Sequence, residues 1–383
     1  MPLHAVPLHA MPPHAMPQQA PSPAARRGPV RRAARARSAV VAGALVLMAA
    51  ACAPGASAGP APTQDGRTVL RYQGTVGQVA LPELAEDLGY FEVVELEWVS
   101  DVTGGPASIQ ATATGETDIG SAFNGAIVKL VASGAPITSV ISSYGSDELT
   151  HGGTYVLEDS PVRTARDLVG RKVGINTLGA QHEAVTRSWL TDQGLSADEI
   201  EKVELTVIPP VNAEQALREG QLDAVQLGGI LKDSALERGG LRRLFSEVDL
   251  FGTFAYGTYV LNDRVLAEEP EAAADFVQGV ARAIRWAQVT DPQEVRDRFV
   301  RIVEERGRHE DPANIAYWKS VSIPAPGGVI QEEEITTWID WLVADGRVPA
   351  GSVTPEDVYT NDLNPYADGT WEPDAGPDGE PLG

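Results

Sequence analysis

Short apolar stretches alternate with amphipathic stretches from residue 68 to residue 261, and glycines separate many of them. The apolar stretches predict strands at 69–73, 94–99, 115–123, 137–144, 154–157, 171–175, 205–208, 222–227, 241–245 and 256–261. The segments between them predict helices at 79–91, 108–114, 124–134, 164–170, 182–193, 212–219 and 229–237. Strands that alternate with helices in this way predict an α/β protein with mainly parallel sheets flanked by helices.

The pattern becomes helical after residue 261. Apolar residues recur at helical spacing in 272–287, 294–306, 312–319 and 335–345. The tryptophans of these segments, which are Trp286, Trp318, Trp338 and Trp341, are expected to pack the helices together. Residues 361–383 are rich in Pro, Gly and Asp, so we expect a disordered tail there.

Two α/β series followed by helices predict two lobes. We expect lobe 1 to comprise 68–157 and 257–360, including the C-terminal helices, and lobe 2 to comprise 158–256. The chain would then cross between the lobes twice, near Leu157 and near Gly257, and two crossings can form a hinge.

The N-terminal region predicts a secretory signal. Ser38–Ala51 is an apolar run without charge, six arginines precede it, and small residues lead to Cys52. The run is too short to span a bilayer. A cysteine after three alanines resembles a lipobox, so we expect a leader at 1–51, a lipid on Cys52 and a flexible tether at 52–67. A plain cleaved signal with an incidental cysteine is the alternative.

The start codon and the export route are both open. The first 29 residues form repeats rich in Pro, Ala and His, which favours a true start near Val30. Arg31 and Arg32 suggest twin-arginine export, but the hydrophobic residues that should follow such a pair are missing.

Charge and cysteine content exclude several functions. The net charge is −23, and removal of the six leader arginines makes it −29, so nucleic-acid binding by a basic surface is excluded. An anionic ligand would need local donors. Cys52 is the single cysteine, which leaves none for a disulfide or a cysteine-bound zinc, and the histidines show no metal-ligand spacing. No metal or cofactor is therefore predicted.

Four motifs in register carry a family resemblance. They are L-A-E-D-L-G-Y-F at 84–91, G-E-T-D-I-G-S-A-F-N-G-A at 115–126, D-L-V-G-R-K-V-G-I-N-T-L-G-A at 167–180 and A-L-R-E-G-Q-L-D-A-V at 216–225. Behind a lipobox, they resemble the bacterial ABC-transporter substrate-binding lipoproteins of the nitrate/sulfonate/taurine family, which is related to thiamine-pyrimidine synthases. The resemblance implies a two-lobed periplasmic-binding-protein fold (type II). It also implies a monomer that delivers a small solute to a permease and an ATPase.

Candidate ligand-binding residues lie where strands end and helices begin. Ligands of open α/β sheets bind beyond the carboxyl ends of the strands, and helix N-termini supply N–H donors there. With the resemblance, we expect the following residues to contact the solute: Gly77, Gln78, Thr103, Gly104, Phe123, Asn124, Gly125, Asn176, Thr177, Leu178, Gly179, Ala180, Gln181 and Gly228. Tyr144 and Tyr256 are further candidates, and His182 either reaches the cleft or lies on the surface.

Three functions compete at this point. The first is a binding protein of an importer; the second is a ligand sensor without a transporter, which no residue distinguishes from the first. The third is an enzyme that resembles thiamine-pyrimidine synthase, but that class needs a cysteine cluster and a lysine–histidine pair that are missing here. The single G-x-S-x-G match surrounds Ser57 in the tether, so no hydrolase and no catalytic residue is predicted. The solute stays open among sulfonate, nitrate, taurine and heterocycle.

Overall fold

The computed structural model describes residues 66–102 and 104–382. One group of strands comes from both ends of this region. β1 (Thr68–Gly74) pairs in parallel with β2 (Val94–Asp101), and β10 (Phe254–Asn262) lies antiparallel between β3 (Ile119–Phe123) and β4 (Ile137–Ser146). A hydrogen bond from Asp118 N to Arg71 O places the start of β3 beside β1, so this first strand group has the order β2-β1-β3-β10-β4.

A five-stranded sheet forms the second strand group. Its order is β7 (Glu204–Val207), β6 (Lys172–Ile175), β8 (Ala224–Leu227), β5 (Gly153–Leu157) and β9 (Leu241–Ser246). β6 runs parallel to β7 and β8, whereas β5 is antiparallel to β8 and β9. Four of the five strands therefore share one direction, and the predicted mainly parallel sheet is confirmed. In both groups the antiparallel strand takes the fourth place in the order.

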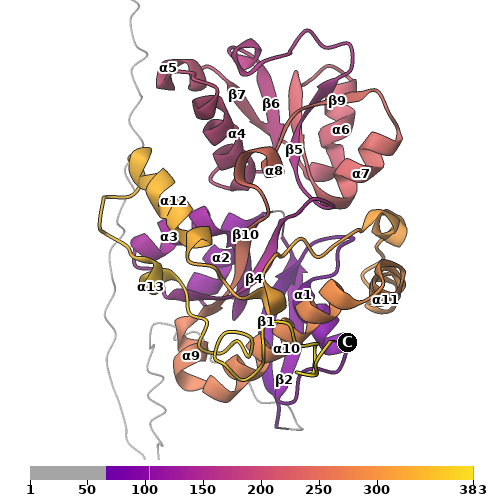
Figure 1. The fold of residues 1–383 in the computed structure, drawn as a ribbon, viewed down its shortest axis with the longest axis vertical. Helices are drawn as coiled ribbons and strands as arrows, with labels where there is room; N and C mark the ends of the chain where they lie inside the picture. The colour runs from indigo at the N-terminus through magenta and orange to yellow at the C-terminus, as the bar shows by residue number, and fades with distance from the viewer. Residues whose placement is uncertain (1–65, 103, 383) are drawn as a thin grey trace, which may run out of the picture. The chain divides into compact units, whose positions relative to one another are not determined.

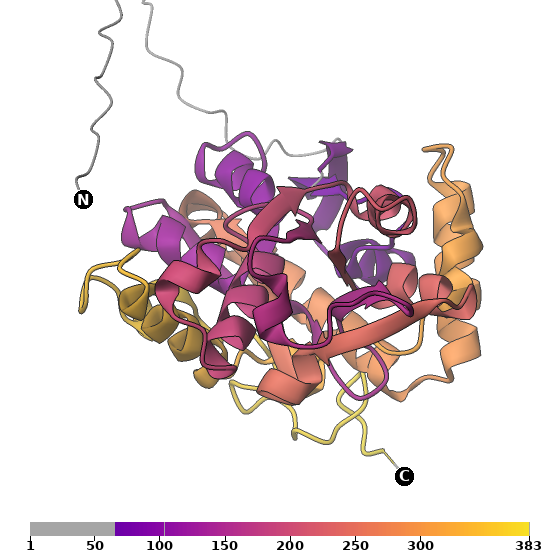
Figure 2. The same ribbon diagram turned by 90° about the horizontal axis from the view of Figure 1, so that it is seen from above.

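Helices flank both strand groups. Around the second group lie η1 (Ala165–Leu168), α4 (Gln181–Asp192), α5 (Ala197–Ile200), α6 (Pro210–Arg218), α7 (Gly229–Glu237) and α8 (Glu247–Phe251), with α4 and α5 on one side of the sheet and α6 and α7 on the other (Figure 1). The first group carries α1 (Leu81–Asp87), α2 (Gly105–Ala113), α3 (Asn124–Ala132), α9 (Asp263–Glu268), α10 (Pro270–Val289), α11 (Pro292–Glu305), α12 (Glu333–Ala344) and α13 (Pro355–Val358). Two short 3₁₀ helices, η2 (Pro312–Tyr317) and η3 (Pro326–Gly328), connect α11 to α12. Figure 2 shows α11 (orange) and α12 (dark yellow) on opposite sides of the strands.

The division into lobes stays a prediction, but strand pairing changes where we place its crossings. β5 was expected in lobe 1, yet it pairs with β8 and β9 of the second group. β10 begins at Phe254 and belongs to the first group. We therefore place the crossings in 147–152 and 247–253. An apolar tetrapeptide such as T-Y-V-L fits either sheet, so its sequence does not identify its partner strands.

The C-terminal segment differs from the expected disordered tail. Asn364 is fully buried, and its Nδ2 donates to Gly327 O. The Tyr366 ring is buried, lies 5.1 Å from the Trp371 ring and donates its hydroxyl to Gly376 O. Arg285 of α10 donates its Nε to Ala375 O. A few buried aromatic side chains order this Pro- and Gly-rich segment on α10, although its composition gives no helix or strand period.

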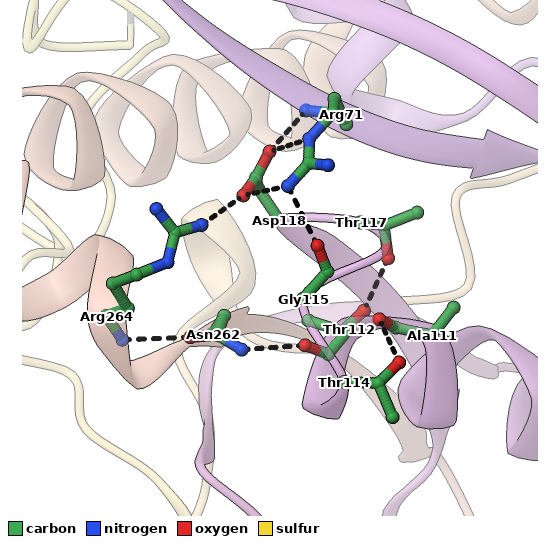
Figure 3. A network of polar contacts seen from close by, with 9 residues as sticks. All are labelled: Arg71, Ala111, Thr112, Thr114, Gly115, Thr117, Asp118, Asn262 and Arg264. Carbon is green, nitrogen blue, oxygen red and sulfur yellow. Dashed lines mark hydrogen bonds and ion pairs between the residues drawn. The ribbon is translucent and has the colours of Figure 1, made fainter. Parts of the chain in front are cut away.

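A buried carboxylate connects β1, the start of β3 and α9 in the first strand group. Asp118 is fully buried and accepts hydrogen bonds from the backbone N, Nε and a terminal nitrogen of Arg71 and from Arg264 (Figure 3). Its hydrogen bond with Arg71 raises the pKa of that guanidinium. Asp118 belongs to the motif at 115–126, so this part of the motif serves the packing of β1, β3 and α9. In the described residues no helix is both long and apolar enough to cross a membrane.

Candidate functional site

A cavity of about 390 Å³ lies between the two strand groups. Its first wall contains Gly77 and Gln78, which follow β1, and Ser143–Gly145 of β4. The facing wall contains the ends of β6 and β8 and the starts of α4 and α7, and its residues are Asn176, Gln181, His182, Gln226, Leu227, Gly228, Gly229, Ile230 and Leu231. Segments from both strand groups thus enclose one space of the size that small ligands occupy.

Residues 312–322 close a third side of this cavity. We call them the strap; they follow α11 and include η2. The Tyr317 hydroxyl donates to the Glu237 carboxylate, Lys319 Nζ lies 2.9 Å from Asp233 Oδ1, and Ser320 Oγ donates to Thr150 Oγ1 at 2.8 Å. The strap therefore joins the helices of the first strand group to α7 and to the loop before β5.

A buried glutamate forms part of the facing wall. Glu247 is 2% exposed; its Oε2 accepts from Gly152 N at 2.8 Å and its Oε1 accepts from Gln181 Nε2 at 2.8 Å. Desolvation raises the pKa of Glu247 to about 7. A Cβ at Gly152 would lie 2.5 Å from Oε1, so a larger residue at this position would displace the carboxylate.

Two histidines on the cavity wall are uncharged at neutral pH. Desolvation lowers the pKa of His182 to about 4, and it also lowers the pKa of His151. His182 Nδ1 accepts a hydrogen bond from Asn176 N at 3.3 Å, so the proton of the neutral ring is on Nε2. Of the two positions considered for His182, the structure supports the one at the cleft.

Five of the predicted residues line the cavity: Gly77, Gln78, Asn176, Gln181 and Gly228. Tyr144 lines it as well, whereas Tyr256 is fully buried among aromatic side chains. That these residues touch the solute stays a prediction. Thr103 and Cys52, together with the leader and most of the tether, lie outside the described residues.

Three predicted residues do not line the cavity, contrary to the sequence prediction: Phe123, Asn124 and Gly125. The Phe123 ring packs edge-on against Trp338 of α12, with 4.5 Å between the ring centroids. Asn124 is fully buried and donates to Glu334 O at 3.1 Å. A Cβ at Gly125 would meet the Phe123 ring at 2.5 Å. The carboxyl end of β3 faces α12 instead of the cavity, which makes these residues part of the core.

The predicted residues after β6 also separate into two groups. Asn176 and Gln181 face the cavity, but Thr177, Leu178, Gly179 and Ala180 do not line it. Leu178 is 54% exposed. Gly179 and Ala180 border a small hollow beside Trp341. Gly104 approaches Thr177 so closely that a Cβ on it would lie 3.2 Å from Thr177 Cγ2. Residues at the two ends of this loop therefore face the cavity, whereas those in its middle do not.

Sequence reasoning missed Glu247, Gln226, His151 and the strap. Glu247 follows Ser246, whose side chain caps α8, and an acidic residue in a first helical turn is ordinary. Gln226 is inside a buried strand, where an amide gives no periodic signal. The strap reaches the cavity through contacts with α7 and with the loop before β5, both distant from it in the sequence. None of these residues carries a local pattern that indicates a ligand.

Comparisons with known proteins show the family to which this chain is similar. The sequence profile described as NMT1/THI5 like matches residues 81–295. An Escherichia coli (strain K12) protein named for aliphatic sulfonate binding is 31% identical over 186 residues, which are 49% of this chain and 54% of that protein. The match therefore spans about half of the length of that relative.

Solved structures share the architecture. The nitrate-binding protein NrtA from Synechocystis PCC 6803 superimposes with a TM-score of 0.62 at 13% identity, covering 81% of this chain and 92% of that one. The aliphatic sulphonate binding protein SsuA from Escherichia coli gives 0.56 at 21% identity, covering 76% and 92%. Both are named as periplasmic binding proteins, so the predicted fold class is confirmed. The family resemblance is confirmed by the sequence profile that matches residues 81–295.

Proposed function

The chain belongs to the NMT1/THI5-like family, and from this premise we propose that it is an extracytoplasmic solute-binding protein of an ABC importer. The observation that carries the proposal is the cavity of about 390 Å³, whose walls come from both strand groups. The sulfonate-binding and nitrate-binding proteins described above share its fold. Binding the solute would make and break no covalent bond.

Capture would proceed by closure of two lobes on the solute. A solute that contacts Gln78 on one wall and Asn176 or Gly228 on the other binds the closed arrangement better than an open one. Binding then shifts the population toward closure. The contact between Lys319 and Asp233 would form part of the closed state, because it joins the strap to α7. The closed form would be delivered to a permease and an ATPase.

A lipid on Cys52 would hold the protein at the membrane face. The apolar run Ser38–Ala51 and the small residues before Cys52 support this anchor. Labelled palmitate should enter the wild-type protein expressed in a bacterium, and Cys52→Ala should prevent the labelling. Equal labelling of both proteins, or none in either, would contradict the anchor while leaving the binding function in place.

A thermal-shift panel tests the proposed binding function. The panel contains benzenesulfonate, taurine, nitrate, pyrimidine, 1-butylamine and benzamidine, added to protein that was unfolded and refolded to remove any bound solute. A ligand at ~100 times its Kd stabilises the folded state by about 2.7 kcal/mol, which raises Tm clearly. We expect at least one class to do so. A flat response to all six would overturn the proposal.

A further inference from the structure

Glu247 presents a carboxylate to the cavity, and Lys232 acts on its charge only from beyond ion-pair distance. Its two oxygens accept from the neutral donors Gly152 N and Gln181 Nε2. Among the described residues, neither lysine nor arginine lies within ion-pair distance of it. Each carboxylate oxygen can accept a second hydrogen bond. A ligand that brings a positively charged donor would supply the missing partner.

Gln226 provides a second acceptor on the same wall. Its Nε2 donates to Thr186 Oγ1 at 2.9 Å, whereas its buried Oε1 has no donor within the part of the chain that the structure describes. The Thr186 hydroxyl gives its one hydrogen to His182 O at 2.6 Å, so it can only accept from Gln226. This fixes the amide orientation and leaves the oxygen as the free atom.

Glu247 and Gln226 lie toward the same end of the strands in the second strand group. Gln226 is in β8, Gly152 immediately precedes β5, and Glu247 immediately follows β9. β5 lies between β8 and β9, and Gly153 is paired with both Leu227 and Ser246. The two acceptors therefore belong to the ends of closely spaced strands and face the same cavity.

Positive charge around the cavity is already engaged. Lys319 Nζ lies 2.9 Å from Asp233 Oδ1, and Lys232 Nζ lies 3.5 Å from the same oxygen. Within 66–102 and 104–382, arginine is absent from the lining residues. A sulfonate would bring three more acceptor oxygens beside Glu247, and Lys319, the lysine that lines the cavity, is already paired with Asp233.

We propose that the cavity takes an organic cation with N–H donors, an ammonium or an amidinium, which binds Glu247 and Gln226. This inference rests on the proposed binding function and names its solute class. An N–H donor that carries positive charge makes shorter and stronger hydrogen bonds to a carboxylate than a neutral donor does. The cargo would then differ in charge from the sulfonates and nitrate for which the relatives are named.

The inference also predicts a pH dependence. Glu247 has a pKa of about 7, so its ionised fraction rises about tenfold between pH 6 and pH 8. The charged and titratable groups near it are Lys232 and Asp233 of α7, Lys319 of the strap, two histidines and three tyrosines; the last two sets are His151, His182, Tyr144, Tyr155 and Tyr256. Burial lowers the pKa of both histidines and raises that of Tyr144, which limits their charge changes in this range. Affinity for a cation should therefore rise up to about tenfold over this interval.

Calorimetric titration with two ligands of similar shape, benzamidine and benzenesulfonate, tests the inference. We expect benzamidine to bind more tightly, and Glu247→Gln to weaken it at least tenfold at pH 8 and to remove its pH dependence. The matched control is Glu334→Gln. Glu334 is another buried carboxylate whose pKa is raised to about 7. It accepts hydrogen bonds from Ala255 N and Gln331 N, and it does not line the cavity. The control should retain benzamidine affinity within about twofold.

Three results would overturn the inference. Tighter binding of benzenesulfonate than of benzamidine would reject the cation but keep the binding function. Equal losses in Glu247→Gln and Glu334→Gln would reduce Glu247 to a structural role. Failure of both ligands and of the whole thermal-shift panel would reject the binding function and the inference together.

Discussion

Gly228→Trp is expected to abolish solute binding while the protein stays folded. Gly228 has φ −143° and ψ 165°, an extended conformation that any residue adopts. A Cβ there would find Gly152 Cα as its nearest neighbour, at 3.7 Å, so the side chain has room. Because Gly228 lines a cavity of about 390 Å³, an indole would occupy much of that space. We expect at least a hundredfold loss of affinity.

Leu178→Trp is the matched control for this substitution. Leu178 is 54% exposed and does not line the cavity, although the sequence placed it among the ligand contacts. The thermal shift given by the strongest panel ligand should vanish in Gly228→Trp and persist in Leu178→Trp. The opposite pattern would locate the site at 177–180 and contradict the cavity assignment. Far-UV circular dichroism of both variants checks that they are folded.

Among the substitutions proposed for this protein, Trp338→Ala is expected to lower the free energy of unfolding most. Trp338 is fully buried, and its ring lies 4.5 Å from Phe123, 5.4 Å from Phe251 and 6.1 Å from Tyr256. Truncation of a buried tryptophan removes its transfer free energy and leaves a cavity, at a cost of about 4 kcal/mol. Urea unfolding should show this as a lower transition midpoint with an unchanged slope.

Trp341→Ala provides the comparison within the same helix. Trp341 is only partly buried, and Arg347 lies over its ring at 5.1 Å. An exposed cation–π contact contributes about 0.5–1 kcal/mol, so the loss should be much smaller than for Trp338, at roughly 1–2 kcal/mol with the lost packing. If the two alanine variants lost equal stability, the core assigned around Trp338 would be wrong.

The sequence predicted the positions of the strands and helices well, but it did not predict which strands pair with one another. Strands such as β6 and β8 were found because apolar residues are bounded by glycine and followed by helical periodicity. The membership of β5 in the second group was missed because strand pairing depends on residues far away in the sequence. The ordered segment around Tyr366 was missed for a related reason, since it takes its structure from α10.

The candidate site was predictable where the strand-end rule applies. Gly77, Asn176 and Gly228 follow strands and line the cavity, in agreement with that rule. Phe123 also follows a strand, but α12 covers it, and that contact joins residues more than two hundred positions apart. Glu247 was not predicted because its role depends on the loop at Gly152 and on the side chain of Gln181, neither of which is a sequence neighbour.

A crystal structure of the protein with the strongest panel ligand tests the central claim most directly. We predict ligand density between Gln78 and Gly228, with a ligand N–H within hydrogen-bond distance of the Glu247 carboxylate. Density at Phe123–Gly125 or on the outer face of 177–180, with an empty cavity, would contradict the account.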